Sequence, residues 1–380
     1  MATAADARGQ GRLHSRLLLA ALGGLVVGLV LGGQLLGERS QVPEGTDQPS
    51  IPGPAPTPAR DEAYRPTYHF TPAEHWMNDP NGPIRHDGEY HLYYQYNPEG
   101  NLWGGISWGH ATSQDLVRWE EQGVAIPAER DMLIFSGSTV EDARNTSGRC
   151  GEEGCLVALY TGHRIDEATG LARQTQDVAF SHDGGYTWEP FENNPVIDLG
   201  QAEFRDPNVF WHEPSEHWIL TVALPLERQV LFYRSPDLLT WEQVSTFGPM
   251  GATEGIWECP VLLPLPVDGD PDRIRWVLKV DHNPGHVTGG SGAQYFVGDF
   301  DGTTFVPEAE ATYPRWVDHG PDFYCAMPFS DGVDDRGRHT WIAWMSNWDY
   351  ASTVPTHPWR GAMTLPQTIA LTADGDTARL

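Results

Sequence analysis

The chain has 380 residues, of which 39% are hydrophobic and 15 are tryptophan, so it has enough apolar material for one large domain or two smaller ones. Its 52 acidic and 24 basic side chains give a formal net charge of −28. This charge repels phosphate backbones and anionic membranes, so we expect a neutral partner and no nucleic acid.

The first 37 residues have the character of an export or anchoring segment. Arg8, Arg12 and Arg16 precede an uncharged apolar run over residues 17–33. The run lies between a signal-peptide core and a spanning helix in length, and the lack of an Ala-x-Ala cleavage site favours the anchor. We therefore expect residues 1–37 to be a signal peptide or a membrane anchor, with the following chain outside the cytoplasm.

Residues 38–63 form the next compositional unit. They are rich in proline, glycine, serine and threonine and contain few apolar side chains. Such a segment cannot bury a core, so we expect a disordered linker.

After residue 64 the pattern changes to short apolar runs bounded by Gly, Pro, Asn or Asp, for example at 91–96, 157–160, 218–222 and 340–344. Such runs are typical of β-strands. No amphipathic helix of about ten residues or more separates them, which argues against a parallel α/β sheet. We predict an all-β fold.

A turn motif with Asp and a following aromatic residue recurs along the chain. It occupies residues 113–120, 181–189 and 235–242, with a weaker copy at 301–305. In such a turn, Ser and Asp can bond to local backbone amides while the aromatic ring packs between sheets. The uneven spacing, near one blade per copy, favours a β-propeller, with a β-sandwich as the alternative.

The four cysteines do not form a metal-binding pattern. Cys150 and Cys155 flank a Gly-Glu-Glu-Gly spacer that allows a small disulfide loop, and the sequence leaves open whether this bridge forms. Cys259 and Cys325 show no ligand spacing, so we predict no metal site. Lys279 is the only lysine in the chain, and the other basic residues are arginines. We assign no function to this skew.

Three carboxylates stand beside prolines in aromatic segments: Asp79 in the segment 75–83, Asp206 in 204–208 and Glu258 in 257–260. Aromatic rings cover the apolar faces of sugars, and isolated carboxyl groups supply acid, base or nucleophile. The pattern indicates glycoside hydrolysis.

The same segments, WMNDPNG, FRDP and WECP in this order, resemble glycoside hydrolase family 32, which contains invertases, inulinases and levanases. The similarity includes WGGISWGH at 103–110, FSGS at 135–138, GPDFY at 320–324 and WRGAM at 359–363. It implies a five-bladed β-propeller over residues 64–366 whose central cavity receives a terminal fructosyl unit. The family usually carries a β-sandwich after the propeller, whereas we expect residues 367–380 to be only a short remnant.

The resemblance assigns the nucleophile to Asp79, a transition-state stabiliser to Asp206 and the acid/base to Glu258. In a retaining mechanism, nucleophile and acid/base lie about 5–5.5 Å apart, so Asp79 and Glu258 must converge. We expect the Asn78 amide and turn N–H groups to keep Asp79 ionised, Arg205 to hold Asp206, and apolar groups to surround Glu258.

Further residues are expected to bind the sugar. The set comprises Trp76, Asn78, Gln95, Trp103, Phe135, Ser136, Arg205 and Trp344. Trp348 is an alternative to Trp344 as the far wall of the pocket. Gly105 stands where many relatives have Asn, which removes an amide from the pocket region. No cofactor is implied, because proton transfer and carboxylate attack need neither metal nor nucleotide.

The expected function is a retaining, exo-acting β-fructofuranosidase that hydrolyses fructans, levan or inulin, and sucrose. A sucrose invertase or fructosyltransferase is the alternative with the same carboxylates. A carbohydrate-binding propeller without turnover is the alternative from a different class. The linkage preference and the oligomeric state are left open.

Overall fold

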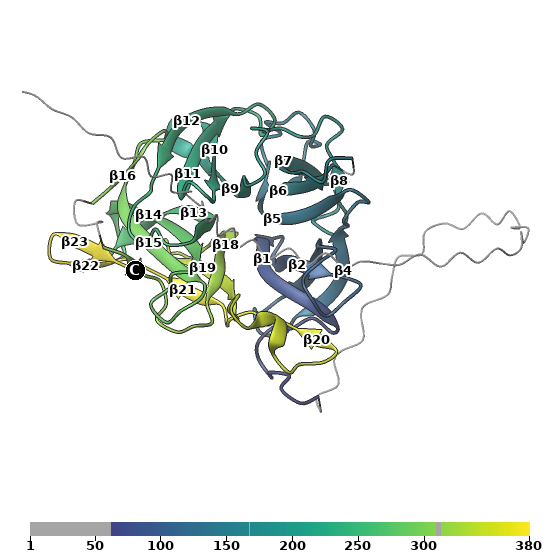
Figure 1. Cartoon of the computed structure of the whole chain (residues 1–380). Coiled ribbons are helices and arrows are strands. Elements are labelled where there is room, and N and C mark those ends of the chain that lie inside the picture. The colour runs from purple at the N-terminus through teal and green to yellow at the C-terminus, as the bar shows by residue number, and fades with distance from the viewer. Residues whose placement is uncertain (1–61, 167, 309–312) are drawn as a thin grey trace, which may run out of the picture. The chain divides into compact units, whose positions relative to one another are not determined.

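The computed structural model describes residues 62–166, 168–308 and 313–380. These residues form short β-strands and two 3-10 turns, η1 (Glu213–Ser215) and η2 (Ala351–Thr353) (Figure 1). The prediction of an all-β fold is confirmed for the described chain.

The expected export or anchoring segment, residues 1–37, lies outside the described residues, as does nearly all of the expected linker. Within the part of the chain that the structure describes, no helix is long and apolar enough to cross a membrane.

The strands follow one another in antiparallel groups of four. The first group is β1 (His75–His86), β2 (Glu89–Asn97), β3 (Ser107–Ser113) and β4 (Glu120–Ile126). The second is β5 (Met132–Glu141), β6 (Leu156–Ile165), β7 (Ala172–Ser181) and β8 (Glu189–Pro190). The third is β9 (Arg205–His212), β10 (His217–Leu224), β11 (Gln229–Ser235) and β12 (Glu242–Phe247).

The fourth group is β13 (Ile256–Val267), β14 (Asp270–Asn283), β15 (Gly292–Phe300) and β16 (Phe305–Pro307), with β17 (Arg315–Trp316) paired to β15. The last strands are β18 (Tyr324–Val333), β19 (His339–Trp344), β20 (Trp359–Arg360), β21 (Gln367–Ile369), β22 (Thr372–Asp374) and β23 (Thr377–Arg379). Strands β21, β19 and β18 join the first group, because β18 runs parallel to β1 with Ile84 opposite Ser330.

The first strand of each group lies nearest the centre of the described unit (Figure 1). These inner strands contact one another in cyclic order: β1 with β5, β5 with β9, β9 with β13, β13 with β18, and β18 with β1. This is the arrangement of a β-propeller. The count of five blades stays a prediction, because hydrogen bonds merge β18, β19 and β21 with the first group.

The hydrophobic core consists of layers between neighbouring groups of strands. Separate clusters join β1–β4 to β5–β7, β5–β7 to β9–β11, β10–β12 to β13–β16, β13–β15 to β18 and β19, and β18 and β19 to β1–β3. Middle strands are therefore covered on both faces, which explains continuous apolar runs such as that of β10. A smaller cluster at the centre contains Trp76, Tyr324 and Trp344.

The recurring turn motif lies at one position in four groups, between the third and fourth strands. The carboxylates of Asp115, Asp183, Asp237 and Asp301 each accept backbone N–H groups from the residues that follow them. The aromatic residues after the turns pack against the layers between groups. The structural interpretation of this repeat is confirmed.

Residues 367–380, which we expected to form a short remnant after the propeller, are packed into the fold. Strand β21 pairs with β19, and Ile369, Leu371 and Ala378 join the core between β13–β15 and β18–β19. Elsewhere, Cys150 and Cys155 form a disulfide, which settles the pairing that the sequence left open.

Candidate active site

The inner strands break their hydrogen-bonding ladders where the candidate residues lie. Register shifts occur between Met77 and Pro80 in β1, between Ile134 and Gly137 in β5, and between Glu258 and Val261 in β13. The pairing of β9 and of β18 is interrupted in the same way, at Asp206 and after Tyr324.

Proline explains several of these breaks, because it lacks the N–H that a central strand donates to its neighbour. A bulge re-aims the side chains beside it, so each carboxylate-proline segment turns its acid out of the strand pattern. Asp206 illustrates this with a φ of +67°, in the left-handed region. The bulges place all three acids at the centre of the strand ring.

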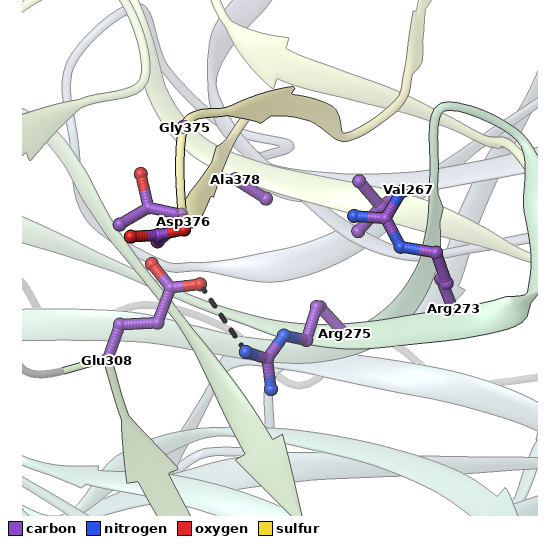
Figure 2. A pocket seen from close by; sticks show the side chains of 8 residues that line it. Val267, Arg273, Arg275, Glu308, Gly375, Asp376 and Ala378 are labelled. Carbon is purple, nitrogen blue, oxygen red and sulfur yellow. Dashed lines mark ion pairs between the residues drawn. The ribbon is translucent and has the colours of Figure 1, made fainter.

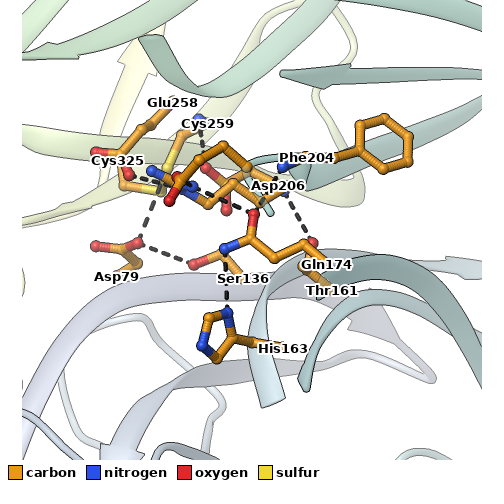
Figure 3. Close-up of polar contacts among 12 residues, drawn as sticks. Asp79, Ser136, Thr161, His163, Gln174, Phe204, Asp206, Glu258, Cys259 and Cys325 are labelled. Carbon is orange, nitrogen blue, oxygen red and sulfur yellow. Dashed lines mark hydrogen bonds and ion pairs between the residues drawn. A yellow bond between two sulfur atoms is a disulfide. The ribbon is translucent and has the colours of Figure 1, made fainter. Parts of the chain in front are cut away.

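Figure 3 shows that Asp79, Asp206 and Glu258 converge there, from β1, β9 and β13. The charge of Glu258 raises the pKa of Asp79, and the charges of Glu258 and Asp79 raise the pKa of Asp206, which requires that the three lie close together. Asp79 and Asp206 are buried, with 8% and 6% of their surface exposed, and the Glu258 side chain retains 16%. The predicted convergence of distant acids is therefore present.

One oxygen of Asp79 is fixed and the other is free of partners. Oδ2 accepts a hydrogen bond of 2.9 Å from Ser136 Oγ, and Cys259 Sγ lies 3.9 Å from it. Oδ1 is buried and has no hydrogen-bond partner among the described residues. An oriented carboxylate with one uncommitted oxygen is suited to nucleophilic attack.

Asp79 does not match the expectation of an acid kept ionised by its amide neighbours. Burial raises the pKa of Asp79 to about 7, and this outweighs the lowering influence of the neighbouring Asn78 and Ser136 side chains. The charge of Glu258 raises the pKa further. The dominant effect is desolvation, which a sequence motif does not reveal.

Asp206 is held by the backbone rather than by Arg205. Its Oδ2 accepts the N–H of Cys259 at 2.9 Å, and its own N–H donates to Thr161 Oγ1 at 3.0 Å. Burial raises the pKa of Asp206 to about 7, although the charge of Arg205 opposes the rise. The positive charge of Arg205 thus lowers the pKa of Asp206, but its guanidinium does not hold the carboxylate as we expected.

Glu258 has polar neighbours instead of the apolar surroundings that we expected. Arg205 Nε donates to Oε1 at 2.9 Å, and the hydroxyl of Tyr324 donates to Oε2. Arg205 also contacts Glu203 and Gln174, which fixes the guanidinium. Glu258 is therefore held at both oxygens, in an orientation set by residues from two other strands.

The three acids cannot all be ionised at low cost in one buried site, because each negative charge raises the pKa of its neighbours. Glu258 raises the pKa of both aspartates in this way. A site that keeps a proton on one carboxyl group while another is ionised provides the two states that acid-assisted nucleophilic displacement needs.

The expected sugar-binding residues divide into a buried group and a rim. Trp76 and Gln95 are almost fully buried; Trp76 Nε1 donates to Asn78 Oδ1 at 2.7 Å, and Gln95 Nε2 donates to the Ile134 carbonyl at 3.1 Å. These bonds hold the side chains in the protein. Their role in binding stays a prediction.

At the rim, Phe135 stacks on His163 with ring centres 4.5 Å apart and meets the edge of Trp103 at 5.9 Å. Trp103 is 46% exposed. Exposed aromatic surface beside the carboxylates can cover the apolar face of a sugar.

For the far wall of the pocket, the choice was between Trp344 and Trp348. Trp344 has no exposed surface, whereas Trp348 is partly exposed and stacks on Trp76 with ring centres 6.0 Å apart. Trp344 packs against both rings, with its centre 6.0 Å from that of Trp76 and 4.9 Å from that of Trp348. The assignment of Trp344 to the wall stays a prediction, and Trp348 is better placed for direct contact.

Several residues that support the site could not be recognised from the sequence. Tyr324 lies in a segment that carries the family resemblance, but its bond to Glu258 depends on tertiary packing. Thr161 and Gln174 give no signal in the sequence. Cys259 and Cys325 form a second disulfide between β13 and β18.

The sulfurs of that disulfide lie near Asp79, a grouping that resembles a set of metal ligands. Joined in a disulfide, they offer no thiolate to an ion.

Figure 2 shows a separate hollow near β22 and β23, crossed by the ion pair of Arg275 and Glu308 at 4.0 Å. None of the candidate active-site residues lines it.

These features define a glycosidase-type site: a propeller with carboxylates at its centre and aromatic residues at its rim. The family model for the glycosyl hydrolases family 32 N-terminal domain matches residues 69–379. The chain belongs to glycoside hydrolase family 32.

Individual relatives support this membership. The chain is 48% identical over 323 residues to a levanase from Bacillus subtilis, covering 84% of this chain and 46% of that protein. The crystal structure of exo-inulinase from Aspergillus awamori is similar with a TM-score of 0.79 and 42% identity, over 84% of this chain and 67% of that one. A fructofuranosidase from Schwanniomyces occidentalis, complexed with fructose, gives 0.78 and 44%, over 84% and 62%.

The chain spans between 46% and 64% of the length of the curated relatives that it matches. Their activities are therefore a basis for a proposal about this chain.

Proposed function

We propose that the chain is a retaining, exo-acting β-fructofuranosidase that hydrolyses terminal fructosyl units of fructans and sucrose. The observation that carries the proposal is the convergence of Asp79, Asp206 and Glu258 at the centre of the strand ring, with one Asp79 oxygen uncommitted. Family membership and the names of the relatives, levanase and exo-inulinase, support fructans as the substrate class.

In the first step, Asp79 attacks the anomeric carbon and Glu258 gives its proton to the leaving oxygen. The carbon–oxygen bond of the glycoside breaks as the bond to Asp79 forms, which leaves a fructosyl ester. Asp206 accepts hydrogen bonds from the sugar hydroxyls and stabilises the positive charge of the transition state.

In the second step, Glu258 takes a proton from water, and the resulting hydroxide attacks the anomeric carbon. The ester bond breaks, and Asp79 returns as a carboxylate. Two displacements at the same carbon retain its configuration. No cofactor takes part in either step.

We further propose that this chemistry takes place outside the cytoplasm. The two disulfides, Cys150–Cys155 and Cys259–Cys325, favour an oxidising compartment. Relatives named extracellular exo-inulinases agree with that placement, as does the expected role of residues 1–37 in export or anchoring.

The test is chromatography of the products that the purified chain forms from levan, inulin and sucrose, offered separately, with Glu258→Gln as the inactive control. Free fructose from a polymer without intermediate oligosaccharides is expected. Oligosaccharides from the polymers contradict exo action, sucrose-only cleavage supports the invertase alternative, and longer products from sucrose support transfer. A folded protein that binds fructan without cleaving it would be the carbohydrate-binding propeller.

A further inference from the structure

The acid/base Glu258 and its partner Tyr324 belong to strands that no sheet joins. Strand β13 lies in the sheet of β14 and β15, whereas β18 pairs with β19 and β1. Ladder hydrogen bonds therefore do not fix the position of one strand against the other. The bond from the Tyr324 hydroxyl to Glu258 Oε2 nevertheless depends on that position.

A disulfide supplies one cross-link between the two strands. The residue after Glu258 is Cys259, the residue after Tyr324 is Cys325, and their sulfurs are bonded. Both cysteines have left-handed backbones, with φ of +46° and +50°. Residues other than glycine keep such conformations only where the surrounding structure holds them.

A buried ion pair supplies the second cross-link. Lys279 and Asp281 on β14 have no exposed surface and contact each other. Lys279 Nζ donates to the carbonyl of Cys259 at 2.8 Å, while Asp281 Oδ1 accepts the N–H of Cys325 at 2.9 Å. One ion pair thus holds both cysteine backbones.

The chemistry of these two residues favours a positioning role. Burying a charged pair costs desolvation energy that its attraction often fails to recover, so a buried ion pair is poor evidence for stabilisation. Lys279 is also the only lysine in the chain, and its head group reaches the backbone of the residue beside the acid/base. Lys279, to which the sequence assigned no function, therefore contacts the backbone next to the acid/base.

We propose that Lys279, Asp281 and the Cys259–Cys325 disulfide form a brace that positions Glu258 for proton transfer, by holding Tyr324 against it. This inference rests on the proposed function, because proton donation is the role assigned to Glu258. A shift of about 1 Å in a reacting group can lower a rate roughly 100-fold, so small movements of β18 against β13 matter. The brace residues are positioning residues and need not touch the sugar.

The test uses the double variant Cys259→Ala/Cys325→Ala and compares two donors, sucrose and β-fructosyl fluoride. Sucrose needs a proton on its leaving oxygen, whereas fluoride leaves with little acid assistance. We expect kcat/KM, which reports only the first displacement, to fall about 10-fold or more on sucrose and to change much less on the fluoride. A general loss of folded structure would lower the rates on sucrose and on the fluoride by the same factor.

The matched control is Cys150→Ala/Cys155→Ala, which removes the other disulfide, in the core layer between β5–β7 and β9–β11. It should leave the ratio of the two rates unchanged. Asp281→Asn is the milder second variant, because its amide oxygen can still accept the Cys325 N–H while the charge is lost. Unfolding measurements confirm that each variant is folded.

Equal losses on both donors, or wild-type rates on sucrose, would overturn the brace while leaving the proposed function intact. If the wild type cleaves no fructosyl donor, the proposed function fails separately. In that case, crystal structures test the brace. We expect the hydrogen bond from the Tyr324 hydroxyl to Glu258 to be lost in the variant that lacks the Cys259–Cys325 disulfide. An unchanged contact would overturn the proposal.

Discussion

Replacing Asp79 by asparagine should stabilise the fold near and above neutral pH while abolishing turnover. Asp79 is buried, and burial raises its pKa from 3.8 to about 7. The folded protein therefore disfavours the ionised form that the nucleophile requires. Asparagine has nearly the same shape, keeps an oxygen that can accept the Ser136 hydroxyl, and has no charge to bury.

The magnitude follows from the pKa difference between the folded and unfolded states. A shift of about three units corresponds to about 4 kcal/mol, at 1.36 kcal/mol per unit. Between about pH 4 and pH 7 the folded state binds more protons at this site than the unfolded state, so stability falls as pH rises. The advantage of Asp79→Asn is near zero at about pH 4 and approaches 4 kcal/mol at about pH 8.

The assay is urea unfolding followed by tryptophan fluorescence at both pH values, with the free energy of unfolding extrapolated to water. Asp237→Asn is the control with the opposite sign: hydrogen bonds from backbone N–H groups of its turn outweigh partial burial and lower the pKa of Asp237. That variant should lose stability at about pH 8. A gain for Asp79→Asn that is equal at both pH values, or a loss at about pH 8, would contradict a raised pKa of Asp79 in the folded protein.

Three further substitutions probe other parts of the site and fold. Tyr324→Phe removes a hydrogen bond to a charged group, worth about 1.5–3 kcal/mol, so kcat in steady-state assays should fall about 10- to 100-fold; an unchanged kcat would contradict the assigned contact with Glu258. Trp103→Ala, at an exposed ring, should raise KM for fructans about 3- to 10-fold without lowering the melting temperature, and an unchanged KM would exclude Trp103 from binding. Gly137→Ala places a methyl group 2.1 Å from the carbonyl oxygen of Leu159, so chemical unfolding should reveal a loss of about 3 kcal/mol, and wild-type stability would contradict the packing.

The sequence was most informative where a motif depends on local chemistry. Proline one or two residues after each carboxylate marked the segments that bulge from the inner strands, because a missing N–H breaks the ladder wherever the strand lies. The recurring Asp turns were equally local, since each carboxylate bonds to N–H groups a few residues away.

The environment of the acids was less predictable, because it is made by residues distant in the chain. Glu258 has a polar setting through Tyr324, 66 residues later, and through Arg205, 53 residues earlier. The Cys259–Cys325 bridge spans 66 positions without a recognisable spacing. Lys279 carried no local signal, and only the antiparallel pairing of β14 with β13 reveals its contacts.

The most direct test of the account is to trap the covalent intermediate. Glu258→Gln is incubated with β-fructosyl fluoride, which can form the ester without acid assistance, and its peptides are analysed by mass spectrometry. We expect one added fructosyl residue on the peptide that contains Asp79, and none after Asp79→Asn is introduced as well. An adduct on another residue, or released fructose with inverted anomeric configuration from the wild type, would contradict it.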